Sequence, residues 1–314
     1  MAEGGHTGAE AGPLPAVGSY RTTKLLHASR KTAVYLAETA MGDSVVLKRC
    51  RPVQAERERA TLMALKRADP DCTRFVRLVD FVHGAAADAD PLESLVLEPA
   101  STSLEAWLRS CYHRPSWSEV LLVGDAVGRA LEWLHAQDLC HTDVKPSNVL
   151  CTDGGRNWKL CDFAGAAKEG ARSEECTWQY CAPEQARALL AQEPLLASFD
   201  ADIWAYSKLL YELAAGSPDA LMPQGAPDAS DTRALQALAE LKDPVVVESK
   251  LRFPVLRSVL ALCVLAKSCP CLRRTRSTGE STRPTFVYTE TICVCVCVCV
   301  CVCVCLGLGT LRYP

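Results

Sequence analysis

The sequence carries no excess of charge of either sign. Its 314 residues include 34 lysines and arginines against 37 aspartates and glutamates, which gives a formal net charge of −3. A chain-wide basic surface that would hold nucleic acid or an anionic membrane is therefore excluded, and we expect neither as a partner. With 23% charged and 49% hydrophobic residues, the chain can fill one large or two moderate domains, which excludes wholesale disorder.

A secretory signal is also missing. Residues 1–18 are rich in glycine, alanine and proline, but no basic stretch there precedes an apolar run. We interpret them as a flexible leader and expect a cytoplasmic protein, with the nucleus left open.

Metal-type and secretory cysteine patterns are absent as well, although the sequence has 18 cysteines. Eleven of them are scattered, with no CxxC pair and with Cys269 and Cys271 as a lone CxC. Neither a metal centre nor a disulfide framework is expected from such spacing. We interpret these eleven as reduced thiols that fill small apolar spaces.

The other seven cysteines alternate with valine between Cys293 and Cys305. A TG dinucleotide repeat encodes such a tract, so we interpret residues 291–314 as a gene-model artefact. A membrane anchor is the alternative, because residues 292–311 carry no charge. Against it, Gly307 and Gly309 interrupt the run, and alternating β-branched residues favour a strand over a helix.

The region between these two ends changes character along its length. Strands are predicted for five apolar runs, at residues 19–26, 32–38, 44–49, 75–82 and 94–98. Helices are predicted where apolar residues recur at helical spacing, at residues 54–67, 118–139, 199–215 and 257–267. A β-rich part with one helix therefore precedes a longer, mostly helical part.

Six short strings carry the chemistry. They are VVLK ending at Lys48, HTDVKPSNVL beginning at His141, KLCDFAG containing Asp162, CAPE ending at Glu184, DIWAYSKLLYEL beginning at Asp202 and TRPTF around Arg283. Each string alone is weak, but together and in this order they resemble the signature set of eukaryotic protein kinases of the Ser/Thr type. The resemblance covers residues 20–286, nearly the whole chain outside its two ends.

The resemblance implies an α+β, bilobal protein-kinase-like fold over residues 19–290. The N-lobe, residues 19–100, would hold a small antiparallel five-stranded sheet and one helix. The C-lobe, residues 101–290, would be larger and helical, with ATP between the lobes. Because the chain runs into the Cys-Val tract soon after Phe286, we expect the helical lobe to lack its last helix.

The resemblance also implies roles for charged residues, since phosphoryl transfer depends on placement and on neutralising spreading negative charge. Lys48 would contact the α- and β-phosphates, and a helix glutamate would hold it. The candidates are Glu56 and Glu58, and Glu58 is favoured because leucines follow it at +4 and +7 on the inward face.

The catalytic-loop residues follow from the same resemblance. Asp143 would accept or orient the proton of the substrate hydroxyl, and Lys145 would neutralise the γ-phosphate. Asn148 and Asp162 would hold Mg²⁺, which prefers oxygen ligands and leans on substrate phosphates.

Apolar residues would enclose the adenine of ATP, since such sites are largely apolar with few polar groups. Leu97 would be the gatekeeper, and the backbone of Glu98 and Ala100 would meet the adenine edge. The ring would lie among Val34, Val46 and Leu150.

The sequence departs from the family pattern at three places. His27, Ser29 and Thr32 stand where the phosphate-covering loop has glycines, so weaker ATP binding is expected. Ala164 replaces the glycine after Asp-Phe, which costs energy if that position needs a positive φ. Thr142 replaces the arginine that usually pairs with a phosphorylated activation loop, so we expect activity not to require phosphate on Ser173.

These features predict a serine/threonine protein kinase that transfers the γ-phosphoryl group of ATP, with Mg²⁺, to a Ser or Thr hydroxyl of a protein substrate. The alternative is a pseudokinase that acts as a scaffold or allosteric partner, because the loop glycines are missing. A small-molecule phosphotransferase is disfavoured, because the CAPE, DIW and TRPTF strings are typical of kinases that bind protein substrates.

Overall fold

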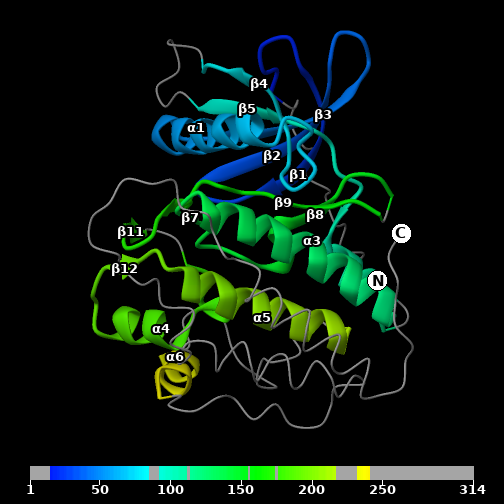
Figure 1. Cartoon of the computed structure of the whole chain (residues 1–314). Coiled ribbons are helices and arrows are strands. Elements are labelled where there is room, and N and C mark those ends of the chain that lie inside the picture. The colour runs from blue at the N-terminus through cyan, green and yellow to red at the C-terminus, as the bar shows by residue number, and fades with distance from the viewer. Residues whose placement is uncertain are drawn as a thin grey trace, which may run out of the picture. The chain divides into compact units, whose positions relative to one another are not determined.

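The computed structural model describes residues 15–84, 92–111, 114–154, 156–173, 176–216 and 232–240 (Figure 1). The chain divides into two compact units, as a bilobal fold requires. The first comprises Met1–Ser103 and Val149–Ala166, and the second comprises Leu104–Asn148 and Ala167–Pro314. The predicted boundary at residue 100 lies close to the first crossing, but the return of residues 149–166 to the first unit was not predicted.

The first unit is built on the five-stranded antiparallel sheet that the sequence predicted. Its strands lie in the order β1-β2-β3-β5-β4. Their bounds are Arg21–Ala28, Thr32–Glu38 and Ser44–Cys50 for β1 to β3, and Leu78–Val82 and Glu93–Leu97 for β4 and β5. The strand predicted from residue 75 begins three residues later, because Phe75 makes a parallel bridge with Leu160 instead.

The strand register places two different sets of side chains on the two faces of this sheet. Residues directly opposite each other in an antiparallel pair share a face. Lys48 lies opposite Val34 and Leu95, and Val46 lies opposite Leu97, so these side chains share one face. The other face packs into a core cluster of Val17, Ala37, Val45, Leu47 and Val96. Because Val17 is buried in that cluster, packing begins before the predicted end of the leader at residue 18.

Helix α1, Pro52–Ala68, accompanies this sheet (Figure 1). Proline occupies its first turn, where a missing N–H costs nothing, and Lys66 and Arg67 occupy its last turn, where they oppose the helix dipole. Its buried positions are Ala55, Glu58, Leu62 and Leu65, which recur at helical spacing. A three-stranded sheet of β6, β8 and β9 (Thr102–Ser103, Val149–Cys151 and Trp158–Leu160) completes the unit.

The second unit is mostly helical. Its helices are α2 (Leu104–Ser110), α3 (Trp117–Ala136), α4 (Pro183–Leu190), α5 (Phe199–Ala215) and α6 (Thr232–Ala239). Ser116 and Glu119 form a capping box at the start of α3, and Gly216, with a φ of 72°, ends α5 in the left-handed conformation. Two pairs of short strands, β7 (Leu139–Cys140) with β10 (Ala167–Lys168) and β11 (Arg172–Ser173) with β12 (Leu195–Leu196), connect the loops between these helices.

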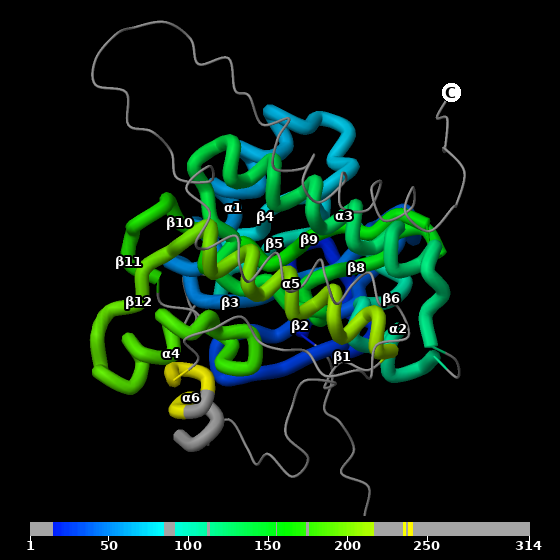
Figure 2. The backbone as a smooth tube through the Cα atoms, turned by 60° about the horizontal axis from the view of Figure 1, so that its bottom comes forward, coloured from blue at the N-terminus to red at the C-terminus, as the bar shows by residue number. Residues whose placement is uncertain are grey.

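Helices α3 and α5 lie side by side in this unit (Figure 2). Their close approach depends on Gly124, where an added Cβ would lie 2.9 Å from Leu210 Cδ2. The hydroxyl of Tyr206 on α5 donates a hydrogen bond to the Gly124 carbonyl at 2.7 Å. This pairing fixes α5, whose N-terminal end carries Asp202.

Within the described ranges, no helix combines the length and the apolar character of a membrane span. Several predicted features lie outside the described residues. They are the leader up to residue 14, the helix at 257–267, Arg283, the missing last helix and the Cys-Val tract at 291–314.

Candidate active site

Lys48 lies at the centre of a buried ion cluster in the first unit. Its Nζ is 2.7 Å from Glu58 Oε2 and 2.6 Å from Asp162 Oδ1. The side chains of Lys48 and Glu58 are 9% and 1% exposed, whereas that of Asp162 is 33% exposed. Of the two candidate glutamates, the structure therefore pairs Lys48 with Glu58, while Glu56 lies on the surface next to Arg59.

Burial and charge act against each other in this cluster. Burial favours the neutral amine of Lys48, but the Glu58 and Asp162 carboxylates outweigh it and raise the pKa of Lys48 above its usual value. Burial also raises the pKa of Glu58, and the positive charge of Lys48 opposes that shift. The cluster thus holds a positive charge at a fixed point beside Asp162, the carboxylate with the most exposure.

The backbone after Asp162 shows whether Ala164 occupies a position that needs a positive φ. Asp162 has a φ of 65°, a left-handed conformation that is strained for a residue other than glycine. Phe163 is fully buried and packs edge-on against Phe75, with ring centroids 5.6 Å apart. Ala164 is not among the residues with positive φ, so replacing glycine at this position imposes no left-handed strain.

The residues predicted to enclose adenine also lie in the first unit. Val34, Val46 and Leu97 share the face of the sheet that carries Lys48. Leu97 is buried, whereas Val34 and Val46 are half-buried, as are Ala100 and Leu150. Half-buried apolar side chains on the lysine face can contact a flat apolar ring.

Glu98 is held by a residue that the sequence did not reveal. Its Oε1 lies 2.6 Å from Lys159 Nζ and accepts a hydrogen bond from the Arg77 N–H at 2.8 Å. The Glu98 N–H in turn donates to the Arg77 carbonyl at 3.0 Å. Because both Lys159 and Glu98 are largely buried, their ion pair fixes the main chain that was predicted to meet the adenine edge. A lysine within a strand gave no sign in the sequence of being buried.

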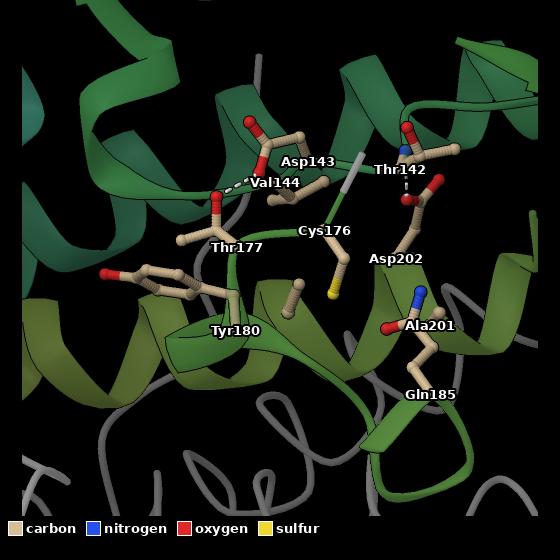
Figure 3. A pocket seen from close by; sticks show the side chains of 10 residues that line it. Thr142, Asp143, Val144, Cys176, Thr177, Tyr180, Gln185, Ala201 and Asp202 are labelled. Atoms are coloured by element: carbon tan, nitrogen blue, oxygen red, sulfur yellow. Dashed lines mark hydrogen bonds between the residues drawn. The ribbon is translucent and has the colours of Figure 1, made fainter. Parts of the chain in front are cut away.

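The second unit gathers the catalytic-loop residues around Asp143. The Asp143 Oδ2 lies 2.6 Å from Lys145 Nζ and 3.1 Å from the amide nitrogen of Asn148. The Oδ1 accepts a hydrogen bond from the Thr177 hydroxyl at 2.6 Å (Figure 3). Lys145 also donates to Thr177 Oγ1 at 2.8 Å, so three residues hold the carboxylate in one orientation.

Thr177 is the clearest positioning residue that the sequence did not reveal. The Thr177 hydroxyl donates a hydrogen bond to Asp143 and accepts one from Lys145. A threonine seven residues before Glu184 was the available signal, but the contact joins residues 34 apart in sequence.

Asp202 fixes the backbone immediately before Asp143. Its carboxylate accepts a hydrogen bond from the Thr142 N–H at 2.8 Å (Figure 3). It also accepts one from the His141 N–H at 2.7 Å, and His135 Nε2 lies 2.9 Å away. Asp202 is 1% exposed, so these charge-assisted bonds are shielded from water. They hold Thr142 at a φ of 71°, which a β-branched residue rarely adopts.

The family model for the protein kinase domain matches residues 31–277, well over half of the chain. The chain belongs to the protein kinase family. This confirms the family predicted from the six ordered strings.

Curated relatives match shorter stretches of this kinase. Serine/threonine-protein kinase meng-po of Drosophila melanogaster is 31% identical over 100 residues, which are 31% of this chain and 22% of that protein. Human ribosomal protein S6 kinase alpha-1 is 34% identical over 124 residues, 37% of this chain and 16% of that protein. Serine/threonine-protein kinase KIC1 of Saccharomyces cerevisiae is 30% identical over 135 residues, 43% of this chain and 12% of that protein. The chain thus spans less than a quarter of the length of these relatives.

The donor set of this kinase fits a magnesium ion. The amide nitrogen of Asn148 donates hydrogen bonds to the carboxylate of Asp143 and, at 2.8 Å, to the backbone carbonyl of Asp143. The amide oxygen of Asn148 is therefore the atom that would bind a metal. Asp162 offers a partly exposed carboxylate, one oxygen of which contacts Lys48. Among the described residues, no group of three or more His, Cys, Asp or Glu side chains is poised to hold a metal. Asn148 and Asp162 would each offer an oxygen ligand to Mg²⁺, with substrate phosphates as further ligands, and the ion would neutralise phosphate charge.

We expect replacement of Thr177 by valine to lower turnover. Valine keeps the shape but removes the hydroxyl that links Asp143 and Lys145. Loss of charge-assisted hydrogen bonds should reduce kcat about 10- to 100-fold. We would measure kcat by steady-state kinetics for Thr177→Val. The control is Thr177→Ser, which keeps the hydroxyl. Equal turnover of the valine and serine variants would contradict the role assigned to Thr177.

Ser173 is not expected to be an activating phosphorylation site. It lies in β11, which pairs with β12, and is 6% exposed, so a phosphate there would need the strand pair to open. The Ser173→Ala variant should keep the turnover of the unaltered chain, measured with protein from the same expression host. Loss of most activity in this variant would show that phosphate on Ser173 is required.

Proposed function

We propose that the chain is an active serine/threonine kinase, which transfers the γ-phosphoryl group of ATP to a Ser or Thr hydroxyl of a protein. The observation that carries the proposal is the fixed orientation of the Asp143 carboxylate. Its carboxylate is oriented by Lys145, Asn148 and Thr177, and the loop beneath it is fixed by Asp202. A general base needs such a fixed geometry before its pKa matters.

The charged residues divide the work that phosphoryl transfer requires. Lys48, fixed by Glu58, would contact the α- and β-phosphates of ATP. Asp143 would take or orient the proton of the attacking hydroxyl, and Lys145 would offset charge on the transferred group. None of the departures from the family pattern removes one of these charges.

Two features favour Ser and Thr over Tyr as acceptors. Lys145 stands two residues after Asp143, in the DVKPSN string that is typical of Ser/Thr kinases. The matched relatives are named as serine/threonine-protein kinases or as an S6 kinase.

The proposal is tested with the full chain and ATP labelled in the γ-phosphate. With Mg²⁺ and a generic protein rich in Ser and Thr, we expect label on phosphoserine and phosphothreonine after acid hydrolysis. Removing Mg²⁺ with a chelator should abolish the transfer, and adding it back should restore it. Label transfer that is indifferent to Mg²⁺, or absent altogether, would contradict the proposal.

A pseudokinase remains the second candidate because of the turn between β1 and β2. The Ser29 hydroxyl accepts hydrogen bonds from the N–H groups of Lys31 and Thr32 at 3.3 and 3.1 Å. In a phosphate-covering loop such N–H groups would face the nucleotide. Because Ser29 occupies them, this turn is expected to contribute little to ATP binding.

Replacing Ser29 with glycine should therefore strengthen nucleotide binding. The change releases two backbone N–H groups and removes the side chain between them and a phosphate. We expect the Kd for Mg-ATP to fall about 3- to 10-fold, measured by calorimetry. The Kd for adenosine, which has no phosphate, serves as the control and should not change. An unaltered Kd for Mg-ATP would show that this turn does not limit binding.

A further inference from the structure

Lys208 is a buried cation outside both the catalytic loop and the lysine cluster. It lies on α5, the helix that also carries Asp202, and only 9% of its side chain is exposed. Taking an ammonium group out of water is costly, so a lysine in such a place needs partners that hold its charge. The DIWAYSKLLYEL string contains Lys208 but gave no sign of what those partners are.

The contacts of Lys208 lead to one short segment. Its Nζ donates a hydrogen bond to the Gln179 carbonyl and lies 4.5 Å from the centroid of the Tyr180 ring. The face of an aromatic ring attracts an ammonium group, and more strongly where water is excluded. Both residues belong to the turn Trp178–Tyr180, which directly follows Thr177. Lys208 therefore binds the main chain and a side chain of the same turn.

Glu212 completes this anchor from the next turn of α5. Its Oε1 lies 3.5 Å from Lys208 Nζ, and its Oε2 accepts a hydrogen bond from the Tyr180 hydroxyl at 2.7 Å. Glu212 is 0% exposed, so its carboxylate needs a cation beside it as much as Lys208 needs an anion. The two charges compensate each other, and each of the two residues holds a different part of the turn.

The turn passes this support on to the catalytic loop. The Tyr180 N–H donates to the Thr177 carbonyl at 2.8 Å, which closes the turn. The Thr177 hydroxyl donates to Asp143 at 2.6 Å (Figure 3). Asp202 fixes the backbone immediately before Asp143. Helix α5 thus supports both partners of the hydrogen bond between Thr177 and Asp143, one through Asp202 and the other through Lys208.

We propose that Lys208 is a positioning residue for phosphoryl transfer, whose buried ammonium fixes the turn Trp178–Tyr180 so that the Thr177 hydroxyl meets Asp143. Lys208 acts through these residues and contacts no substrate. Its hold on the turn is independent of the proposed function. Its effect on turnover rests on the proposed function, because that effect acts through Asp143.

The test variant removes both buried charges at once. Lys208→Met alone leaves Glu212 buried without its cation, and such a chain can fail to fold. Lys208→Met with Glu212→Gln leaves no unpaired charge at this place. Its glutamine keeps an oxygen that accepts from the Tyr180 hydroxyl, while the lysine hydrogen bond to the Gln179 carbonyl is lost.

The matched control removes an ion pair of the same helical spacing from the surface. Asp125 and Arg129 on α3 form an exposed i,i+4 pair, as Lys208 and Glu212 form a buried one. Arg129→Met with Asp125→Asn makes the corresponding changes of charge. This control should behave as the unaltered chain in both tests.

The first test measures hydrogen exchange of the full chain by mass spectrometry and needs no activity. The amide of Tyr180, which closes the turn, should exchange about 10-fold faster in the variant of Lys208 and Glu212. The amide of Thr142, which donates to Asp202, should exchange as in the unaltered chain. An unchanged rate at Tyr180 would overturn the proposal. Faster exchange at both amides would overturn it too, because the whole unit would then have loosened.

The second test is a double-mutant cycle on turnover. Lys208→Met with Glu212→Gln should lower kcat about 10-fold. Added to Thr177→Val, the same two changes should lower kcat no further, because the hydrogen bond through which they act is already gone. An equal loss of kcat with threonine and with valine at position 177 would overturn the proposal.

The two tests separate this proposal from the proposed function. If no variant transfers phosphate, the unaltered chain included, the proposed function is contradicted, and the exchange rate at Tyr180 still decides whether Lys208 holds the turn. If the unaltered chain transfers phosphate and the variant of Lys208 and Glu212 keeps full turnover, the proposed function stands and the role of Lys208 is overturned.

Discussion

Replacing Asp143 with asparagine is expected to remove phosphoryl transfer while the fold stays intact. The amide keeps the shape of the carboxylate and can still accept a hydrogen bond from Thr177. It cannot take a proton from the substrate, and it ends the ion pair with Lys145. General-base groups contribute on the order of 10²- to 10⁴-fold to rate, so kcat should fall by that factor. Label transfer from ATP measures the change.

The control for Asp143 is a carboxylate of the same unit that has no part in the site. Asp125 lies exposed on α3 and pairs with Arg129 at 2.8 Å. Asp125→Asn makes the same change of charge and should match the unaltered chain in turnover. Binding of Mg-ATP should survive in both variants. If Asp143→Asn turned over as fast as Asp125→Asn, the transfer would not depend on Asp143.

The second large effect is expected for Lys48→Met. The change leaves Glu58, which is 1% exposed, without its cation. Breaking a buried ion pair from one side typically costs about 3–5 kcal/mol of the free energy of unfolding. Urea unfolding should therefore show a lower midpoint, and Mg-ATP binding should be lost, because the cation proposed to contact the phosphates is gone.

A double variant separates the two consequences of losing Lys48. Lys48→Met with Glu58→Leu replaces the buried pair by apolar groups, which is often neutral for stability. We expect it to recover most of the lost stability and none of the nucleotide binding. Arg59→Met, which breaks the surface pair with Glu56, should shift stability by less than about 1 kcal/mol. A double variant no more stable than Lys48→Met would show that Glu58 is not the source of the loss.

Local patterns were enough to predict much of the first unit. Alternating apolar residues predicted the five strands, and leucines at helical spacing chose Glu58 over Glu56 as the partner of Lys48. These predictions depend on residues close together in sequence, where periodicity is informative. The start of β4 was placed too early, because the bridge from Phe75 to Leu160 joins distant parts of the chain.

The support around the site could not be predicted for the same reason. Lys159 holds Glu98 across 61 residues, Asp202 holds His141 across 61, and Thr177 holds Asp143 across 34. Nothing in the local sequence of these residues distinguishes a buried polar contact from a surface one. Motifs indicate which residues act, whereas the fold shows which residues position them.

The return of Val149–Ala166 to the first unit has a consequence for biosynthesis. Strands β8 and β9, and Asp162 of the lysine cluster, are translated after the whole catalytic loop. The N-terminal sheet can therefore gain its strands early, but the buried charge of Lys48 must wait for its second carboxylate until residue 162 has left the ribosome. During that interval Phe75 lacks Leu160 and Phe163, which later bridge it and pack against its ring, so the core of the N-terminal unit stays incomplete in the nascent chain.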